Sequence, residues 1–466
     1  MNAPLPAHQK PTRDATHLAA EDIAAHLHPF TNLASHPSIG PLVITRGDGI
    51  HVEDDHGNRY IEAMSGLWCA SLGFSHARVI EAGVAALREL PYYHTFNHRS
   101  NPNVIRLAEK LLSLAPVPMS KVFFANSGSE ANDTAVKLVW YYHNAIGKPA
   151  KKKIIARTNA YHGVTVAAAS LSGLSANHRD FDLPIDRIVR TACPHHYRGA
   201  QPGESERDYS RRLASELEAL ILAEGPDTVA AFIAEPVMGA GGVIVPPEGY
   251  FEEIQAVLRR HDVLLIADEV ICGFCRTGEM FGSTTFGMQP DILTTAKALS
   301  SGYMPISAVM VSDRVHAAIA ENSGKIGTFG HGFTYSGHPV TAAVALETLR
   351  VYEDDRILEH VRAIAPHFQE RLRAYAGHRY VGEVRGVGLL GAVELAQDPA
   401  KRQPFDPAQK AGARVAQLAQ QHGLIVRAMG DTLAFCPPLI IAATEIDDLF
   451  ARFDLAMADF TREMDA

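Results

Sequence analysis

The chain has 466 residues, of which 47% are hydrophobic and 20% are charged, as in an ordinary globular protein. Its net charge is −9, from 43 basic and 52 acidic residues, and the sequence contains no block of basic residues. Nucleic acid and anionic membranes are therefore not expected as partners. No run of about 18 consecutive apolar residues predicts a membrane span.

The N-terminal region begins with MNAPLPAHQKPTRDATHLAAED, which lacks the basic and apolar regions of a signal peptide. We expect residues 1–28 to form a mobile arm and the protein to be cytoplasmic. The segment RGDGIHVEDDHGNRYIEA (46–63) predicts two short strands around a turn at residues 56–58. Residues 29–80 are assigned to the N-terminal part of a small domain.

A strand, a turn and a helix are predicted between residues 121 and 147. KVFFAN is the strand, Ser127-Gly128-Ser129 is the turn, and EANDTAVKLVWYYHNAIG is the helix. Small residues at the start of a helix leave backbone N–H groups directed at open space, which suits a phosphate. Simple capping by serine and glycine explains the same pattern equally well.

An exposed loop and a strand–helix–strand unit are predicted between residues 197 and 270. Residues 197–212, YRGAQPGESERDYSRR, are polar and predict an exposed loop. TVAAFIAEPV and VLLIADEV are continuous apolar runs, and the helical spacing of GYFEEIQAVLRRHD lies between them, so a βαβ unit of a parallel sheet is predicted. Glu235 and Asp268 would then lie at the carboxyl ends of neighbouring strands, where open α/β sheets bind their ligands.

Lys297 follows in the small-residue segment TTAKALSSGYMP. A lysine downstream of an apolar strand that ends in an aspartate is the arrangement that a pyridoxal 5'-phosphate (PLP) enzyme needs. The lysine forms a Schiff base with the cofactor aldehyde, and the carboxylate, here Asp268, pairs with the pyridinium nitrogen.

After about residue 345 the pattern changes. Helices are predicted at 342–353 and 356–375, followed by strand-like alternation in VGEVRGVGLLGAVELA and GLIVRAMGDTLAFCPPLI, typical of antiparallel strands. We assign residues 81–344 to a large domain and 345–466 to a C-terminal α+β domain. The G-x-G-x-x-G pattern at 386–391 does not open a helix, so it does not predict a dinucleotide site.

The five cysteines are odd in number and scattered, which argues against a disulfide framework. Cys272-x-x-Cys275 has no second pair, and Cys193 with His195 and His196 has poor ligand spacing. No metal site is predicted from these residues.

Several long motifs resemble the class III aminotransferases, and most of all their ω-transaminase branch, which uses amines with pyruvate. The resemblance runs from about Phe30 to Pro438 and includes NSGSEAND, YHGVTVAAASLSG, EPVMGAGGVIVPPEGY, LLIADEVICGF, PDILTTAKALSSGYMP and HGFTYSGHP. It implies the aspartate-aminotransferase-like α/β fold (PLP fold type I), with a mostly parallel central sheet and a smaller α+β domain. The family usually has glycine where Cys275 stands, a departure expected to matter little.

The resemblance also implies roles for individual residues. Lys297 would bind PLP covalently, Asp268 would pair with the ring nitrogen, and Tyr161 and Val270 would cover the two ring faces. The remaining cofactor-binding residues would be Ser127, Gly128, Ser129, His162, Glu235 near the cofactor hydroxyl, and Thr334, which would reach the phosphate of the neighbouring subunit. A homodimer with shared sites follows, with a tetramer left open. The substrate pocket would be lined by Phe30, Trp68, Tyr161, Ala240, Phe96 of the other subunit, and Arg427, a mobile arginine that binds carboxylates.

The resemblance therefore implies an amine:pyruvate transaminase. The alternatives within the family are putrescine or polyamine, β-alanine, taurine and 4-aminobutyrate aminotransferases. A PLP decarboxylase or aminomutase would need a dedicated group to orient a carboxylate, and none is recognised in the sequence. A non-catalytic PLP-fold regulator would typically carry a DNA-binding extension or lack the lysine.

Overall fold

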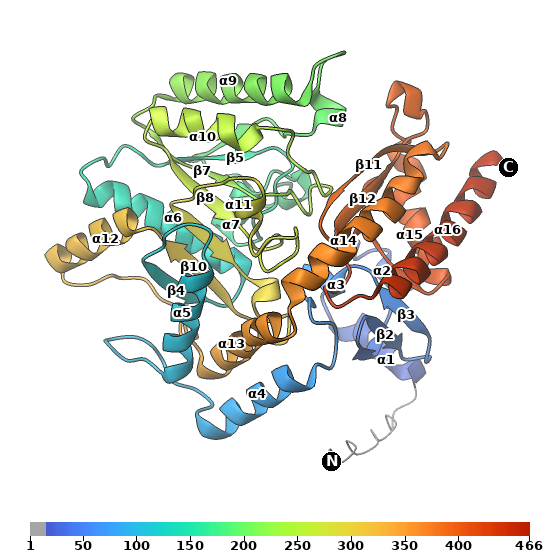
Figure 1. Ribbon diagram of the computed structural model, residues 1–466, viewed down its shortest axis with the longest axis horizontal. Helices are drawn as coiled ribbons and strands as arrows, with labels where there is room; N and C mark the ends of the chain where they lie inside the picture. Colours follow the sequence, from blue (N-terminus) through green and yellow to red (C-terminus); the bar gives the residue numbers. More distant parts are fainter. Residues whose placement is uncertain (1–14) are drawn as a thin grey trace.

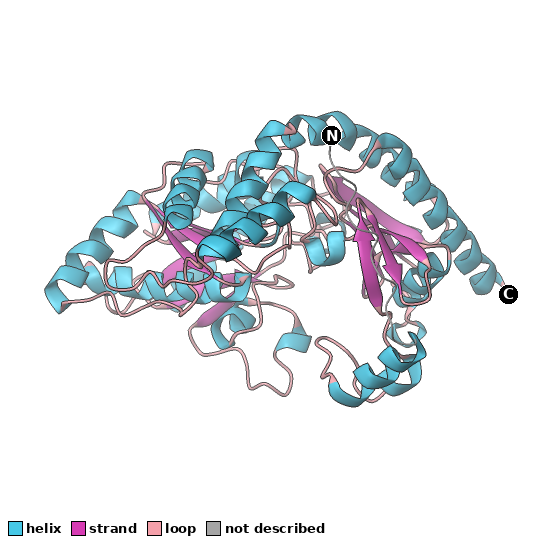
Figure 2. Ribbon diagram, turned by 90° about the horizontal axis from the view of Figure 1, so that it is seen from below, coloured by secondary structure: helices cyan, strands magenta, loops and turns pink. Residues whose placement is uncertain are grey.

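The computed structural model describes residues 15–466. Two assemblies of strands and helices lie beside each other, with the long C-terminal helix along one of them (Figure 2). Of the predicted arm, residues 1–14 lie outside the described residues, whereas Ala15–Ala25 form helix α1.

The large sheet has seven strands and is mostly parallel, which confirms the predicted α/β class. In spatial order its strands are β4 (Lys121–Ala125), β10 (Ser307–Val311), β9 (Ile292–Thr295), β8 (Leu264–Asp268), β7 (Val229–Ala234), β5 (Lys153–Arg157) and β6 (Ile188–Thr191). Strand β10 is antiparallel to both of its neighbours, and the pairs from β9 to β6 are all parallel.

The central strands of this sheet are buried on both faces. In β7, Ile233 packs in the apolar cluster with helix α6 (Gly128–Ala145), while Phe232 packs in the cluster that includes α10 (Tyr250–Arg260). A continuous apolar run is the pattern expected of such a strand. The predicted βαβ unit is therefore confirmed, with Glu235 directly after β7 and Asp268 at the end of β8.

Helix α6 begins at Gly128, two residues before the predicted start at Glu130, so that Gly128 and Ser129 of the predicted turn belong to its first turn. The Ser127 hydroxyl accepts a hydrogen bond from the backbone N–H of Glu130 at 3.1 Å and so caps the helix. The helix ends at Ala145, and Gly147 adopts a φ of +73° immediately beyond it, a conformation that glycine takes at little cost.

Two four-stranded sheets form the other assembly. One contains β1 (Ile44–Asp48), β2 (His51–Asp54), β3 (Arg59–Glu62) and β13 (Leu424–Ile425), and the other contains β11 (Val381–Val387), β12 (Leu390–Leu395), β15 (Thr432–Phe435) and β14 (Arg427–Met429). Strand β13 pairs in parallel with β3, so the expectation of antiparallel strands is wrong for this short segment. The G-x-G-x-x-G pattern forms the turn of the β11–β12 hairpin, as expected for strands.

The predicted loop at 197–212 is wrong over much of its length. His196–Gly199 form the short helix α8, and helix α9 runs from Glu206 to Glu224. Ser205 caps α9 by accepting a hydrogen bond from the backbone N–H of Asp208 at 3.1 Å. Apolar residues four positions apart, beginning with Tyr209, bury one face of the helix, and polar residues cover the other.

The remaining helices surround these sheets (Figure 1). The predicted helices near 342 and 356 are α13 (Pro339–Asp354) and α14 (Ile357–Arg373), and α13 packs against α4 (Ala77–Glu89) and α5 (Pro102–Leu114). The others are α2 (His36–Ile39), α3 (Ser65–Trp68), α7 (Val166–Leu171), α11 (Gly282–Thr285), α12 (Asp313–Ile326), α15 (Ala411–Gln421) and α16 (Ala443–Asp465). Within the described residues, no helix has both the length and the apolar character required to cross a membrane.

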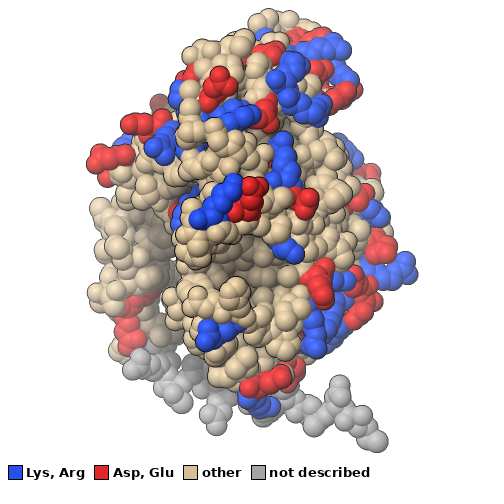
Figure 3. Space-filling model, turned by 90° about the vertical axis from the view of Figure 1, so that its left-hand side faces the viewer, with Lys and Arg blue, Asp and Glu red and all other residues tan. Residues whose placement is uncertain are grey.

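Acidic and basic side chains are intermixed over the face of the molecule in Figure 3, which is hollowed near its middle. Neighbouring charges of opposite sign also pair elsewhere on the surface, for example Arg260 with Glu218 at 2.7 Å. Charges of opposite sign therefore neutralise one another locally at these places.

Candidate active site

Asp268 lies at the end of β8 and is only 3% exposed. Its Oδ2 atom accepts hydrogen bonds from Nδ1 of His162 at 2.7 Å and from Nδ2 of Asn132 at 2.8 Å. Its Oδ1 atom accepts one from the backbone N–H of Val270 at 3.1 Å. An ionised carboxylate only accepts hydrogen bonds, so Nδ1 is the nitrogen of His162 that carries the proton. Each oxygen has about two acceptor positions, which leaves Oδ1 able to accept a further donor.

Asn132 and Thr294 support this carboxylate, although no role was predicted for them. The Thr294 hydroxyl donates a hydrogen bond to Oδ1 of Asn132 at 2.9 Å, and Nδ2 of Asn132 also donates to the backbone carbonyl of His162 at 2.7 Å. Asn132 lies in the NSGSEAND motif, one turn into α6 from Gly128. Asn132 could have been recognised from the sequence, because it is a polar residue on the helix face that covers an apolar sheet.

Lys297 begins a short 3₁₀ helix, Lys297–Leu299, which follows β9. Burial lowers the pKa of its amine, while the nearby charges of Asp268 and Glu235 act in the opposite direction. These effects show that the lysine shares one neighbourhood with both predicted carboxylates. A lowered pKa leaves more of the amine unprotonated, which is the form that acts as a nucleophile or a base.

The start of α6 lies close to the side chain of Val270. The backbone N–H groups of Gly128 and Ser129 lie in the first helical turn and have no partner within the helix, and none outside it among the described residues. A Cβ atom on Gly128 would approach Cγ1 of Val270 to 3.1 Å, so the glycine allows this side chain to lie close to the helix start. Ser129 Oγ accepts a hydrogen bond from the backbone N–H of Val164 at 3.1 Å.

Glu235 connects the sheet edge to Tyr161. Its Oε1 atom accepts a hydrogen bond from the backbone N–H of Tyr161 at 3.0 Å, and its Oε2 atom accepts one from the backbone N–H of Gly239, also at 3.0 Å. Burial raises the pKa of this carboxyl group. Through these bonds Glu235 positions Tyr161 and the segment that carries Ala240.

Arg427 lies on β14, and its guanidinium forms no hydrogen bond or ion pair with any residue between 15 and 466. Burial lowers the pKa of Arg427, and the neighbouring Tyr161 acts in the opposite direction. Burial likewise raises the pKa of the Tyr161 hydroxyl, and the positive charge of Arg427 opposes that shift. A partly buried cation without an internal partner is well suited to an anionic ligand.

The other predicted pocket residues have different environments. The ring of Phe30 is 69% exposed and lies 6.4 Å from that of Tyr161, in an edge-to-face arrangement. Trp68, by contrast, is 2% exposed and packs in an apolar cluster with Met64 and Val237. Its role as a pocket wall stays a prediction.

Phe96 and Thr334 lie together on an exposed part of the chain. A Cβ atom on Gly332 would approach Cε1 of Phe96 to 2.5 Å, and the backbone carbonyl of Thr334 accepts a hydrogen bond from the hydroxyl of Tyr92 at 3.0 Å. Neither residue has a hydrogen bond or a ring contact with Lys297, Asp268 or Tyr161 in the described part of the chain.

Cys275 has a φ of +71°, which lies in the left-handed region that glycine favours. Burial raises the pKa of its thiol to about 12, so the group is protonated. Holding a residue other than glycine in this conformation costs about 1 kcal/mol. The small effect expected of this departure from the family pattern stays a prediction.

The residues assembled here fit PLP. The cofactor has an aldehyde for the amine of Lys297, a ring nitrogen for Asp268, a flat ring for Tyr161 and Val270, and a phosphate for the N–H groups at the start of α6. Oδ1 of Asp268 and the first-turn N–H groups of α6 each retain bonding capacity. The donor set therefore matches the chemical groups of the cofactor.

Comparison with known proteins agrees with this arrangement. A family model described as "Aminotransferase class-III" matches residues 33–457. The chain is 52% identical over 434 residues to "Gamma aminobutyrate transaminase 3, chloroplastic" of Solanum lycopersicum, covering 93% of this chain and 84% of the relative. It is 49% identical over 432 residues to "Gamma-aminobutyrate transaminase 1, mitochondrial" of Oryza sativa subsp. japonica, which covers 92% of this chain and 84% of the relative.

Solved structures are also similar. The omega transaminase from Pseudomonas jessenii in complex with PMP superimposes with a TM-score of 0.95 at 55% identity, covering 96% of this chain and 98% of that chain. A structure described as "Transaminase with L-ala" has a TM-score of 0.90 at 59% identity and covers 91% of this chain.

Proposed function

This chain belongs to the class III aminotransferases, and from that membership we propose that it transfers an amino group from a primary amine or an ω-amino acid to pyruvate. The products are an aldehyde or ketone and alanine, and PLP is the proposed cofactor. The similarity to omega transaminases and to a transaminase described with L-alanine supports this choice of reaction.

The observation that carries the proposal is the guanidinium of Arg427, which lies beside Tyr161 and has no hydrogen-bond or ion-pair partner among the described residues. A keto acid such as pyruvate presents a carboxylate, which a guanidinium binds through two parallel hydrogen bonds. An amine donor with an apolar substituent needs no cation and would instead contact aromatic side chains such as Phe30 and Tyr161. One pocket can then accept both substrates in turn if Arg427 moves aside.

The residues of the chain divide the chemistry among them. PLP, when bound, withdraws electrons from the substrate and so makes its α-proton acidic. The Lys297 amine, whose pKa burial lowers, accepts that proton and returns it to a neighbouring carbon. Hydrogen bonds hold the Asp268 carboxylate in place, where it would pair with the ring nitrogen. Glu235 keeps Tyr161 in place through its backbone N–H group.

A second candidate donor is 4-aminobutyrate. Curated relatives about half identical to this chain are named as its transaminases, and the substrate carries both an amine and a carboxylate. Arg427 could bind that carboxylate as well as that of a keto acid. Putrescine, β-alanine and taurine remain alternatives in the same family.

A homodimer with shared sites is part of the proposal. Phe96 and Thr334 lie among exposed aromatic side chains, with the ring of Tyr92 5.8 Å from that of Tyr335. Exposed apolar clusters of this kind are typical of subunit interfaces. The cytoplasmic location stays a prediction, because the names of plant relatives place those proteins in chloroplasts and mitochondria.

A substrate panel tests the proposal. The PLP-loaded protein is incubated with an aryl-alkyl amine, putrescine, β-alanine, taurine or 4-aminobutyrate, each with pyruvate or 2-oxoglutarate. Alanine and glutamate are then quantified. We expect alanine from the aryl-alkyl amine and pyruvate. Reaction of 4-aminobutyrate alone would establish the second candidate, and the absence of amino-group transfer from every donor would contradict both.

A further inference from the structure

Three polar side chains converge between α1 and α2, outside the active site. Oδ2 of Asp22 lies 2.6 Å from Nε2 of His28 and 3.4 Å from Nε2 of His36. One ligand atom from each residue lies within 4.8 Å of the other two. His26 is adjacent, with its Nδ1 atom 3.2 Å from Oδ1 of Asp22 and its ring centroid 4.2 Å from that of His28.

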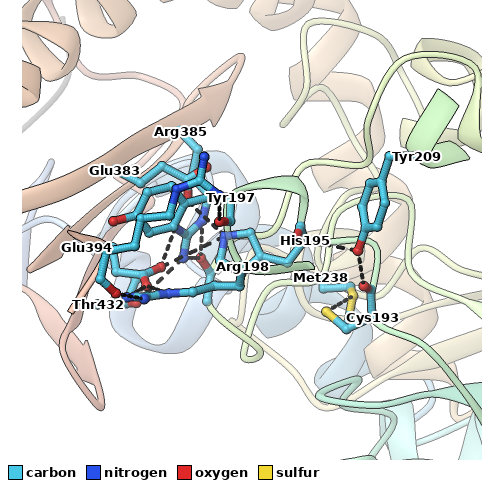
Figure 4. A network of polar contacts seen from close by, with 12 residues as sticks. Cys193, His195, Tyr197, Arg198, Tyr209, Met238, Glu383, Arg385, Glu394 and Thr432 are labelled. Atoms are coloured by element: carbon cyan, nitrogen blue, oxygen red, sulfur yellow. Dashed lines mark hydrogen bonds and ion pairs between the residues drawn. The ribbon is translucent and has the colours of Figure 1, made fainter. Parts of the chain in front are cut away.

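The charge around Asp22 distinguishes this group from the other cluster of comparable composition among the described residues, His195 with Glu383 and Glu394. There the Arg385 guanidinium donates hydrogen bonds to both glutamates and supplies the positive charge (Figure 4). Among residues 15–466, the ion-pair partners of Asp22 are all histidines. Within this part of the chain its carboxylate therefore faces imidazole nitrogens and forms no ion pair with a lysine or an arginine.

We propose that Asp22, His28 and His36 form a binding site for a divalent transition metal of the Zn²⁺ type. Imidazole nitrogens and a carboxylate oxygen are ligands that Zn²⁺ accepts at about 2.0–2.2 Å. Ligand atoms around one such ion lie about 3.3 Å apart in tetrahedral geometry. The His36–Asp22 separation of 3.4 Å is close to that value, and a small rotation of His28 brings its 2.6 Å contact there.

The fourth position of this site has two possible occupants in the same region. The side chain of His26 is 57% exposed and contacts the other oxygen of Asp22, which makes His26 the nearest candidate for a fourth ligand. Water would otherwise complete the coordination, as in zinc sites with three protein ligands. The open position does not affect the identity of the three primary ligands.

Metal binding would fix the loop that carries Phe30. His28 and His36 lie on either side of this residue in the chain, and the ring of Phe30 lies at the edge of Tyr161. Phe30 has a φ of +49°, which the loop must maintain. A metal joining the two histidines would restrain the loop at both ends and hold Phe30 at the candidate substrate pocket.

Calorimetry with Zn²⁺ tests the site. The PLP-loaded full-length protein is stripped with a chelator, freed of excess PLP and titrated with Zn²⁺. The double variant His28→Gln/His36→Gln is compared with the control His195→Gln. We expect one high-affinity Zn²⁺ per chain in the wild type and the control, and an affinity loss of about 10–100-fold or more in the double variant. Equal binding by the double variant, or loss of binding in the control alone, would overturn the proposal.

Two further measurements test whether the metal binds at His28 and His36. Co²⁺ in place of Zn²⁺ should produce visible absorption bands to the red of the cofactor, and these should disappear in the double variant. Chymotryptic cleavage after Phe30, mapped by mass spectrometry, should slow when Zn²⁺ is added to the wild type and not to the double variant. Protection of Phe30 that is equal in both proteins would contradict the role of these histidines.

Discussion

Nδ1 of His162 donates a hydrogen bond of 2.7 Å to Oδ2 of Asp268, and both side chains are buried. The other ring nitrogen of His162, Nε2, is buried and has no partner among the described residues. The bond from Nδ1 holds the carboxylate in place, and Oδ1 of Asp268 keeps capacity for a further donor such as the ring nitrogen of the cofactor. His162 is a positioning residue in this arrangement.

Asp268→Asn should lower turnover by about 100-fold or more, because it removes the charge that favours a protonated cofactor ring while it keeps the shape of the side chain. The affinity for PLP should change much less, since phosphate and ring contacts are retained. Single-turnover absorbance measures the first effect, and PLP titration of the apoprotein measures the second. Asp186→Asn, at an exposed position, is the control. Near-normal turnover would remove Asp268 from its role.

Lys297→Ala should bind PLP without a covalent bond. After reduction with borohydride, mass spectrometry should find the cofactor on Lys297 in the wild type and on no lysine in the variant. Lys151 is the control because it is a buried lysine whose Nζ atom is already engaged, donating to the backbone carbonyls of His261 and Asp262. Lys151→Gln should retain the tag on Lys297. Attachment of the cofactor to another lysine of the wild type would contradict the assignment of Lys297 as the residue that binds PLP covalently.

Arg427→Ala should separate the two half-reactions. Loss of a bidentate, partly desolvated contact should cost about 2–5 kcal/mol, which corresponds to a loss of roughly 30-fold or more in the amination of pyruvate. Amino-group transfer from an aryl-alkyl amine to the enzyme should change little. Both are followed by absorbance in single turnovers.

The controls for Arg427 are Arg427→Lys, which keeps the charge without the planar geometry, and Arg46→Ala at an exposed position. We expect an intermediate loss in the first and none in the second. If both half-reactions fall equally in Arg427→Ala, the arginine is structural.

Thr334→Ala should raise the PLP concentration needed for half-maximal activity by roughly 10–100-fold, the range expected for one hydrogen bond to a charged phosphate. Removing PLP should also weaken the dimer, since a ligand shared by two subunits couples its binding to their association. Sedimentation and PLP titration measure the two effects. Thr328→Ala, on the same exposed segment, should change neither. A PLP-saturated, active monomer would contradict the shared site.

Glu62 predicts a specific pH dependence of stability. Burial raises the pKa of this carboxyl, which is 4% exposed, to about 7. As pH rises from about 4.5 to 7, the unfolded chain loses this proton before the folded chain does, so the free energy of unfolding falls. The loss approaches about 3.4 kcal/mol well above pH 7, at about 1.36 kcal/mol per pKa unit.

Glu62→Gln cannot ionise, so its stability should lack this contribution. The free energy of unfolding of the variant should therefore increase relative to that of the wild type as the pH rises from 4.5 to 7. Thermal unfolding at a series of pH values measures this difference. Glu81→Gln, at an exposed position on α4, is the control and should show no such trend. A constant difference across this pH range would show that the group ionises normally.

The local pattern of the sequence determined the parts of the fold that are stabilised by neighbours in the chain. Two continuous apolar runs predicted β7 and β8, because strands buried on both faces must be apolar throughout. The segment between them has apolar residues at helical spacing and predicted α10. The parallel connection then placed Glu235 and Asp268 at one edge of the sheet. Ser127 and the glycine after it predicted the start of α6, because capping is a local interaction.

Contacts between distant segments were decided only by the tertiary structure. Asn132, His162 and Asp268 come from three separate segments, and no local periodicity relates them. Strand β13 is too short to carry a pattern, so its parallel pairing with β3 follows from packing. The convergence of His28 and His36 on Asp22 likewise depends on the path of the loop between them. A sequence determines which residues can form such contacts, whereas the packed chain determines which of them meet.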